Sequence, residues 1–204
     1  MACKIITITR EFGSGGRTIG HEVAERLGWD FYDWNLVEKI AREYGYCEEF
    51  VEENGEESRP VNPWLSRFGS AGPDINEQLF LNQRKVILDL AEKGNCVIVG
   101  RCADYILENR KDVLNVFIWA SDEFRRERIV NLYGETEENI EKRIATKDKK
   151  RKSYYQYYTG RKWGSPWYYQ MCLESSGVGV PYCVDLIVDL AEKVNNPPLN
   201  GSAV

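Results

Sequence analysis

A glycine-rich loop near the N-terminus constrains the fold of this chain more than any other feature of its sequence. The loop reads Gly13, Ser14, Gly15, Gly16, Arg17 and Thr18. It follows residues 4–9, a short apolar segment that predicts a buried strand, and it precedes apolar residues that recur at helical spacing from Ile19 to Leu27. Glycines allow backbone N–H groups to turn inward, and a helix N-terminus adds the positive end of its dipole. The arrangement therefore predicts a phosphate-binding loop.

The loop departs from the usual nucleotide-binding pattern, G-x-x-x-x-G-K-[ST], at two of its four fixed positions. When the second glycine of the pattern is aligned on Gly16, Glu11 replaces the first glycine and Arg17 replaces the lysine. Arg17 keeps the cation that should reach the β- and γ-phosphates, although its planar fork is not equivalent to an ammonium group. Thr18 keeps the hydroxyl that would coordinate Mg²⁺. All six loop residues are thus candidates for binding ATP.

Two other interpretations of the loop stay open. Gly13 and Gly15 match the first two glycines of the dinucleotide-binding pattern G-x-G-x-x-G, but Thr18 stands at the third. Asp33 lies at about the right distance along the chain to bind a ribose in such a protein. A glycine turn with a purely structural role is the second alternative.

The sequence beyond the loop alternates between predicted strands and helices. Further strands are predicted at residues 31–32, 95–100, 113–120 and 168–173. Helices are predicted at residues 34–44, 76–93, 122–133, 136–150 and 181–194. This alternation predicts an α/β fold, with a parallel sheet covered by helices on both faces. Ligands bind beyond the carboxyl ends of the strands in such sheets, which directs attention to residues 10–18, Asp33, Gly100, Arg101 and Ser121.

Charge is distributed unevenly along the chain. Residues 43–57 contain seven glutamates and no lysine or arginine, whereas residues 142–163 contain nine lysines and arginines and a single acid, Asp148. The basic stretch would attract a polyanionic substrate, and a solvated helix face is the alternative. Residues 45–75 lack clear periodicity and predict an inserted segment over a site. One domain is expected over residues 1–194, followed by a flexible tail at residues 195–204.

Composition argues against several other classes of function. The net charge of −5 argues against a general nucleic-acid or membrane-surface binder. Six scattered cysteines without metal-ligand spacing, and one histidine, leave little material for a zinc site or a histidine-based triad. The sequence contains neither a signal-peptide pattern nor an apolar segment of about 20 residues. A cytoplasmic protein with reduced thiols is therefore expected.

Three segments resemble the cytidylate kinase-like family of P-loop proteins, and in particular its divergent branch. These are residues 9–16, 97–107 and 154–163, within a similarity that extends over residues 4–190. The resemblance implies a three-layer P-loop fold of the nucleoside monophosphate kinase type, with a five-stranded parallel sheet. It also implies an acceptor-binding insertion at about residues 34–75 and a helical lid at about residues 142–165.

The resemblance implies roles for individual residues as well. Gly100 and Arg101 match the start of a Gly-Arg-Asp motif whose arginine binds the acceptor phosphate, while Cys102 departs from its third position. Asp33 matches an aspartate that holds Mg²⁺ through water or orients the acceptor. Arg151 lies in a loosely matched lid pattern and is a candidate to close over the transferred group.

These observations together predict a kinase that transfers the γ-phosphoryl group of ATP to a nucleoside monophosphate, with CMP or dCMP as the first candidate. The predicted catalytic residues are Arg17, Asp33, Arg101 and Arg151, and the predicted ligands of the Mg²⁺ cofactor are Thr18 and Asp33. One of Arg125, Arg126 and Arg128 is also expected to reach the nucleotide. The tyrosines of residues 154–158 are expected either to stack on bases or to pack the lid. A kinase of another small metabolite and a non-catalytic nucleotide sensor remain as alternatives.

Overall fold

Five parallel strands form a single sheet in the order β2-β3-β1-β4-β5. The computed structural model describes residues 3–37, 75–133 and 139–195 of the chain. The strands are β1 (Ile5–Arg10), β2 (Asp30–Tyr32), β3 (Cys96–Val99), β4 (Val113–Trp119) and β5 (Met171–Glu174). The predicted α/β fold class with a five-stranded parallel sheet is therefore confirmed.

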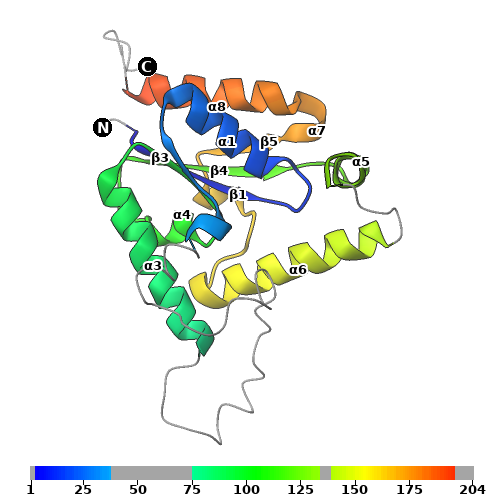
Figure 1. Cartoon of the computed structure of the whole chain (residues 1–204), viewed down its shortest axis with the longest axis horizontal. Coiled ribbons are helices and arrows are strands. Elements are labelled where there is room, and N and C mark those ends of the chain that lie inside the picture. Colours follow the sequence, from blue (N-terminus) through cyan, green and yellow to red (C-terminus); the bar gives the residue numbers. More distant parts are fainter. Residues whose placement is uncertain (1–2, 38–74, 134–138, 196–204) are drawn as a thin grey trace, which may run out of the picture.

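Helices cover both faces of this sheet. They are α1 (Gly16–Leu27), α3 (Ile75–Lys93), α4 (Ala103–Ile106), α5 (Asp122–Tyr133), α6 (Ile140–Thr159), α7 (Ser175–Val178) and α8 (Val180–Asn195), with a short 3-10 helix, η1, at Pro166–Tyr168. Figure 1 shows α1 and α8 on one side of the sheet and α3, α4 and α6 on the other. The molecule thus has the three layers expected of this fold class.

Each face of the sheet has its own apolar core, because strands covered on both faces bury side chains that point in either direction. Ile6 and Ile8 of β1 pack with Ile19 of α1 and Ile187 of α8. On the opposite face Ile5 and Ile98 pack with side chains from α3, α4 and α6. None of the helices in the described part of the chain combines the length and the apolar character needed to cross a bilayer.

The predicted boundaries differ from the observed ones mainly in the C-terminal half. The helix predicted at residues 136–150 is α6, which continues to Thr159 and ends at Gly160 with a φ of 68°. The fifth strand begins at Met171 rather than at residue 168, because residues 166–168 form η1. The inserted segment at residues 45–75 and the tail at residues 195–204 lie almost wholly outside the described residues.

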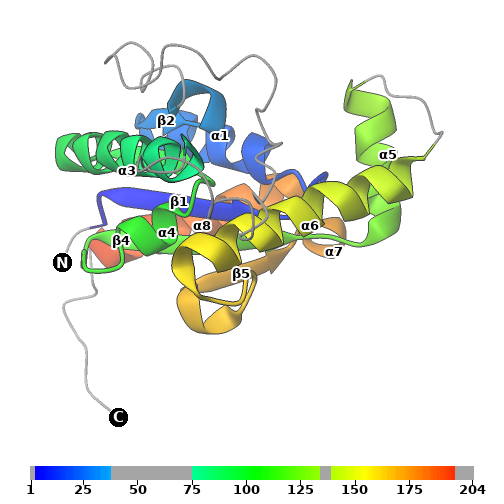
Figure 2. The ribbon, with the colours of Figure 1, turned by 90° about the horizontal axis from the view of Figure 1, so that it is seen from below.

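The topology brings the ends of β1, β3 and β4 to one edge of the sheet. β1 lies at the centre and pairs in parallel with both neighbours, so the loops that follow these three strands lie close together. Figures 1 and 2 both place the N-terminal part of α6 beside α5, and the two helices are in contact. This edge is where the sequence predicts the functional site.

Candidate active site

The glycine-rich loop has the backbone conformation that its composition predicts. Gly13 and Gly15 have φ values of 80° and 83°, a region that other residues rarely adopt, and α1 begins at Gly16. A Cβ added at Gly13 would lie 3.0 Å from Ile129 Cδ1 and 3.1 Å from the Arg125 carbonyl oxygen. The loop therefore needs glycine for its turns and for the close approach of α5.

Ser14 supports the loop from behind. Its side chain is fully buried, and its hydroxyl lies 2.9 Å from the Glu11 carbonyl oxygen and 3.3 Å from that of Ile118. The hydroxyl of Ser175 in turn donates to the Ser14 carbonyl oxygen at 2.6 Å. The Ser14 side chain, predicted to bind ATP, thus ties the loop to β4, and the Ser14 carbonyl oxygen ties it to α7. The remaining loop residues form the open side.

A pocket opens on the outer side of this loop. It is lined by Arg10, Glu11, Phe12, Gly13, Gly15, Gly16, Arg17, Thr18, Trp34, Arg143, Lys147 and Arg151. We call it the loop pocket. Five of its lining residues are arginines or lysines, and its floor is the start of α1. A helix N-terminus surrounded by cations favours a polyanion such as a triphosphate.

Arg17, which replaces the usual lysine, is held by Asp33. Its Nε donates to Asp33 Oδ2 at 2.7 Å, while the other oxygen of Asp33 accepts the N–H of Leu36 at 3.0 Å. The Arg17 side chain is 61% exposed and that of Asp33 only 6%. Asp33 therefore caps the helical residues 34–37 and fixes Arg17 at the mouth of the loop pocket.

Arg128 of α5 contacts the end of the loop, where α1 begins. Its Nη2 donates to the hydroxyl oxygen of Thr18 at 2.7 Å, and its guanidinium carbon would lie 3.4 Å from a Cβ added at Gly15. By contrast, Arg126 points to Glu141 on the surface, with 47% of its side chain exposed. Arg128 is thus placed at the open side of the loop, and the expectation that one of the three arginines reaches the nucleotide stays a prediction.

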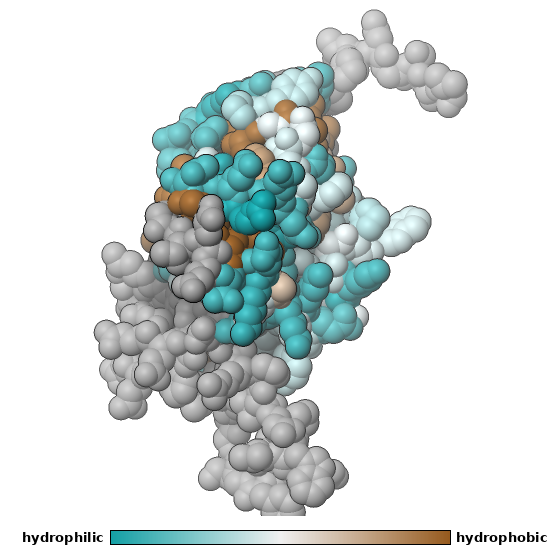
Figure 3. Space-filling view, turned by 90° about the vertical axis from the view of Figure 1, so that its right-hand side faces the viewer, coloured by the Kyte–Doolittle hydropathy of each residue, from teal (hydrophilic) through white to brown (hydrophobic). Residues whose placement is uncertain are grey.

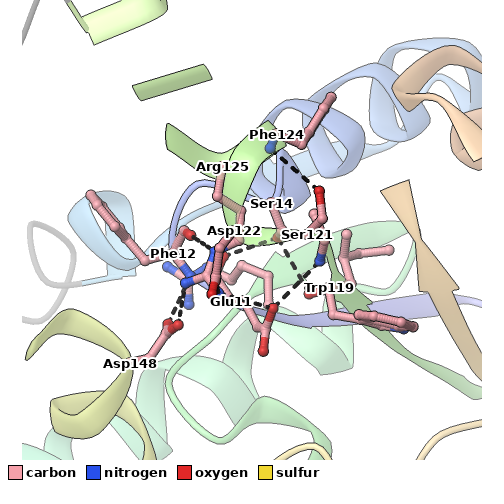
Figure 4. A network of polar contacts seen from close by, with 12 residues as sticks. Glu11, Phe12, Ser14, Trp119, Ser121, Asp122, Phe124, Arg125 and Asp148 are labelled. Carbon is pink, nitrogen blue, oxygen red and sulfur yellow. Dashed lines mark hydrogen bonds and ion pairs between the residues drawn. The ribbon is translucent and has the colours of Figure 1, made fainter. Parts of the chain in front are cut away.

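A buried ion pair clamps the start of the loop (Figure 4). Arg125 of α5 and Asp148 of α6 are 5% and 8% exposed in their side chains and form an ion pair through Nη2 and Oδ2. Between them lies the backbone of Phe12, whose carbonyl oxygen accepts Arg125 Nε–H at 2.6 Å and whose N–H donates to Asp148 Oδ1 at 2.8 Å. Both polar groups of one peptide segment are thus fixed by two helices.

Glu11, which stands where the usual pattern has glycine, belongs to the same network. Its carboxylate lies 3.3 Å from Arg125 Nη1 and accepts the N–H of Ala120 at 3.4 Å. Burial raises the pKa of Glu11, and the nearby Arg125 opposes that shift. A side chain at this position therefore joins the loop to the end of β4.

The Phe12 ring lies against two arginines of α6. Arg143 and Arg151 have their guanidinium carbons 5.7 Å and 5.4 Å from the ring centroid, within the range of cation–π attraction. Seen from the side of α5, hydrophilic side chains cover much of this face (Figure 3). The cations of α6 continue the loop pocket outward along the helix, where Lys142, Arg143, Lys147 and Lys150 line a further hollow.

A second pocket surrounds Arg101. Its lining is Thr9, Arg10, Trp34, Gly100, Arg101, Cys102, Lys150, Arg151, Tyr154, Tyr155 and Trp163. We call it the arginine pocket. The guanidinium carbon of Arg101 lies 5.7 Å from the Trp34 ring centroid and 5.6 Å from that of Tyr154. Four cations and no carboxylate line this pocket among the described residues, so it favours an anionic group.

The turn after β3 presents Arg101 in an uncommon conformation. Gly100, Arg101 and Cys102 have φ values of 85°, 55° and 55°, and α4 starts directly afterwards. Non-glycine residues rarely occupy this region, and local backbone strain of this kind often accompanies functional sites. The same turn buries Cys102, and burial raises the pKa of its thiol.

Asp104 lies behind the arginine pocket. Its side chain is buried and accepts the Tyr155 hydroxyl at 2.6 Å. Desolvation raises the pKa of Asp104, and desolvation together with the nearby carboxylate raises that of Tyr155. Asp104 lines neither pocket, and its hydrogen bond with Tyr155 joins α4 to α6.

The two pockets adjoin each other. Three described residues line both of them, namely Arg10, Trp34 and Arg151. One pocket lies on the glycine-rich loop, and the other holds an arginine beside aromatic rings. This arrangement suits two anionic ligands whose reactive ends meet at the shared residues.

Comparison with known proteins agrees with this geometry. A model of the cytidylate kinase-like family matches residues 5–177. The chain belongs to the cytidylate kinase-like family. The crystal structure of an uncharacterized protein from Eubacterium ventriosum ATCC 27560 is similar to it, with a TM-score of 0.72 and 26% identity over 93% of this chain and 98% of that one. A search of curated proteins gives no match.

Other structures share the fold of this cytidylate kinase-like protein at lower identity. Shikimate kinase from Bacteroides thetaiotaomicron has a TM-score of 0.52 and 18% identity, covering 93% of this chain and 98% of its own. TT1252 from Thermus thermophilus has a TM-score of 0.54 and 16% identity, covering 98% and 100%. These two likenesses show the P-loop kinase fold and nothing finer.

The sequence directed attention to residues 10–18, Asp33 and Arg101, but it assigned no role to several residues that line the two pockets or hold the loop. Arg10, Phe12 and Trp34 line one or both pockets, and Arg125 with Asp148 holds the loop. Asp148 could have been singled out from the sequence, because it is the single acid of the basic stretch at residues 142–163.

The five cysteines within the described ranges are free thiols. Within the same ranges, no group of three acidic, histidine or cysteine side chains could hold a metal ion.

Proposed function

We propose that this protein is a kinase that transfers the γ-phosphoryl group of ATP to a nucleoside monophosphate, with CMP or dCMP as the first candidate. The observation that carries the proposal is the chemistry of the arginine pocket. It is lined by Arg10, Arg101, Lys150 and Arg151 and by no carboxylate in the described part of the chain. A phosphate group fits these cations, whereas a sugar or shikimate hydroxyl would need a base.

The reaction follows from the placement of the two phosphates. An oxygen of the acceptor phosphate attacks the γ-phosphorus of ATP and forms a new P–O bond. The bond from that phosphorus to the β–γ bridging oxygen breaks, and its electron pair leaves with ADP. The acceptor phosphate is largely a dianion at pH 7, because its second pKa is about 6, so no base is required to remove a proton. Positioning and charge neutralisation then supply the catalysis.

The described residues divide into donor and acceptor roles under this proposal. The loop N–H groups, Arg17 and Arg128 bind the donor phosphates, and Arg101 binds the acceptor phosphate. Trp34 and Tyr154 flank the guanidinium of Arg101 and offer aromatic surfaces near the acceptor. Arg143 and Arg151, placed beside Phe12, extend the positive charge over the phosphates.

The loop also offers a ligand for Mg²⁺, which neutralises phosphate charge in this chemistry when it is bound with ATP. The Thr18 hydroxyl oxygen accepts one hydrogen bond, from Arg128, and keeps a lone pair for a metal. Both oxygens of Asp33 already have partners, so Asp33 would act through a bound water. One direct protein ligand together with phosphate oxygens and water suits Mg²⁺.

Turnover of a panel of acceptors tests the proposal. The protein is incubated with ATP and Mg²⁺ and with nucleoside monophosphates, their nucleosides, or shikimate and gluconate, and ADP release is followed. We expect turnover with at least one monophosphate, and CMP or dCMP is the first to try. Turnover only with an unphosphorylated acceptor would identify a kinase of another small metabolite. ATP binding without turnover of any acceptor would favour a nucleotide sensor.

Substitution of Arg101 tests the acceptor site in the same assay. We expect Arg101→Ala to reduce kcat/KM by roughly 30- to 1000-fold, the effect of about 2–4 kcal/mol from a charged hydrogen bond to phosphate. Arg101→Lys should recover only part of this loss, because lysine cannot form the same paired contact. Arg84→Ala is the matched control, since Arg84 is exposed on α3 and lines neither pocket. Equal activity of the Arg101 and Arg84 variants would contradict the assignment.

A further inference from the structure

Arg10 occupies a position that neither the loop pattern nor the Gly-Arg motif explains. It is the last residue of β1, directly before the glycine-rich loop, and pairs with Ile118 across the sheet. Its side chain lines both the loop pocket and the arginine pocket. Its carbonyl oxygen accepts Arg151 Nη1–H at 3.3 Å, which places a second cation beside it.

The Arg10 side chain passes close to two glycines, Gly16 and Gly100. A Cβ added at Gly16 would lie 2.5 Å from Arg10 Cβ and 2.9 Å from Cγ, so the stem passes against the start of α1. A Cβ added at Gly100 would overlap with Arg10 Nη1 and lie 3.2 Å from Cζ, so the guanidinium reaches the turn that carries Arg101. One side chain therefore extends from the donor loop to the acceptor turn.

A cation at this junction has a specific use in phosphoryl transfer. Negative charge spreads over the oxygens of the transferred group as it passes between the leaving and attacking oxygens. Donors fixed where that charge develops stabilise the transition state more than either bound substrate. Arg17, the counterpart of the usual lysine, is held at the pocket mouth by Asp33.

We propose that Arg10 is a catalytic residue that contacts the transferred phosphoryl group at the junction of the two pockets. The proposal rests on the proposed function. It adds the residue that contacts the phosphoryl group while that group moves from ATP to the acceptor. Arg10 stabilises the oxygens of that group while the bond to the acceptor oxygen forms and the bond to the ADP oxygen breaks. It neither gives nor takes a proton, because a guanidinium stays charged.

Kinetics of Arg10 variants give the first test. Arg10→Met keeps a stem of similar bulk and removes the charge, and Arg10→Lys keeps the charge without the fork. With the best acceptor of the panel we expect Arg10→Met to lower kcat by about 100- to 1000-fold while both KM values change by less than about 3-fold. Arg10→Lys should recover part of kcat. Guanidinium ion added at millimolar concentration should partly restore kcat to Arg10→Ala, which a purely structural role would not produce.

A binding measurement gives a second test that needs no acceptor. Fluoroaluminate mimics a phosphoryl group in transfer, so it should tighten the binding of ADP and Mg²⁺ to the wild-type protein. We expect Arg10→Met to lose most of that tightening, while its affinity for ADP and Mg²⁺ alone changes by less than about 3-fold. Arg84→Met serves as the control with wild-type behaviour, and thermal melting checks that each variant is folded.

The outcomes separate this inference from the proposed function. A wild-type protein that turns over no acceptor contradicts the proposed function. Even then, a loss in Arg10→Met of the tighter ADP binding caused by fluoroaluminate would support contact between Arg10 and the transferred group. An Arg10→Met variant that keeps both kcat and the tightening overturns the inference and leaves the kinase proposal intact. A wild-type protein that binds ADP without any tightening also overturns it, because no site for the transferred group would then exist.

Discussion

At position 148 an acid interrupts a stretch that otherwise carries nine lysines and arginines. Asp148 is the partner of Arg125, and the two side chains lie buried on either side of the Phe12 peptide. A buried charge without its partner is costly, because it has lost its contact with water. Asp148 is thus required to balance the buried charge of Arg125, which belongs to a different helix, α5.

Replacement of Asp148 should therefore destabilise the fold. We expect Asp148→Asn to lower the free energy of unfolding by about 3–5 kcal/mol, because it leaves the Arg125 charge buried and uncompensated. Glu141→Gln is the matched control, since the Arg126–Glu141 pair is largely exposed and should contribute about 0–1 kcal/mol. Urea unfolding of both variants measures the difference. Similar small losses in the two variants would show that Asp148 does not stabilise the loop through Arg125.

Asp104 gives a prediction about pH. Desolvation raises its pKa in the folded protein above the unfolded value of about 4, so the folded state binds the proton more tightly. Its contribution to stability is therefore greatest below that unfolded value and is lost as pH rises through the raised folded pKa. Urea unfolding at pH values from 4 to 8 measures this effect. As pH rises, we expect the free energy of unfolding of Asp104→Asn to increase relative to that of the wild-type protein. A stability difference independent of pH would contradict this.

At the scale of secondary structure, the short helices α4 and α7 were not predicted, and α6 extends well beyond its predicted end. The helix continues past residue 150, and Tyr154, Tyr155 and Tyr158 in this extension pack on the core beneath it. Gly160 then ends the helix. Part of the tyrosine run therefore packs against the core, and Tyr154 also lines the arginine pocket.

Movement of α6 as a lid stays a prediction. Its basic side chains repel one another until a polyanion binds, so we expect trypsin to cleave at Lys142 or Lys149 in the free protein and more slowly with a bisubstrate analogue present. Cleavage at Lys193, exposed on α8, is the internal control and should keep its rate. If the analogue leaves the rates at α6 unchanged, the helix is a fixed wall of the site.

The strands and the loop could be predicted because their signals are local. An apolar run followed by glycines and a helical repeat needs no knowledge of the rest of the chain, and Arg101 follows from its place after β3. The contacts of Arg10 and Phe12 could not be predicted, since Arg10 depends on Gly100 and Phe12 on a carboxylate 136 residues away. Thr18, Arg17 and Asp33 were all candidates from the sequence, but the pairing of Thr18 with Arg128 and of Arg17 with Asp33 could not be predicted.

At the scale of the whole molecule, ligand binding should be visible as stabilisation. ATP with Mg²⁺ at 100 times its dissociation constant should add about 2.7 kcal/mol, which for a chain of this size raises the melting temperature by roughly 5–10 °C. We expect Arg17→Ala to remove most of that shift, and Arg26→Ala, on the surface beside Asp185, to leave it unchanged. An unchanged melting curve at millimolar ATP and Mg²⁺ would count against nucleotide binding.

The wall that the two pockets share has a thermodynamic consequence. Arg10, Trp34 and Arg151 come from β1, from the residues after β2 and from α6, so a ligand in either pocket orders side chains that the other ligand also uses. The second ligand then loses less conformational entropy on binding than the first. Donor and acceptor should therefore bind cooperatively, and linkage requires each to tighten the other by the same factor. Calorimetric titration of a non-hydrolysable ATP analogue with and without CMP, and of CMP with and without the analogue, should give two equal ratios above 1.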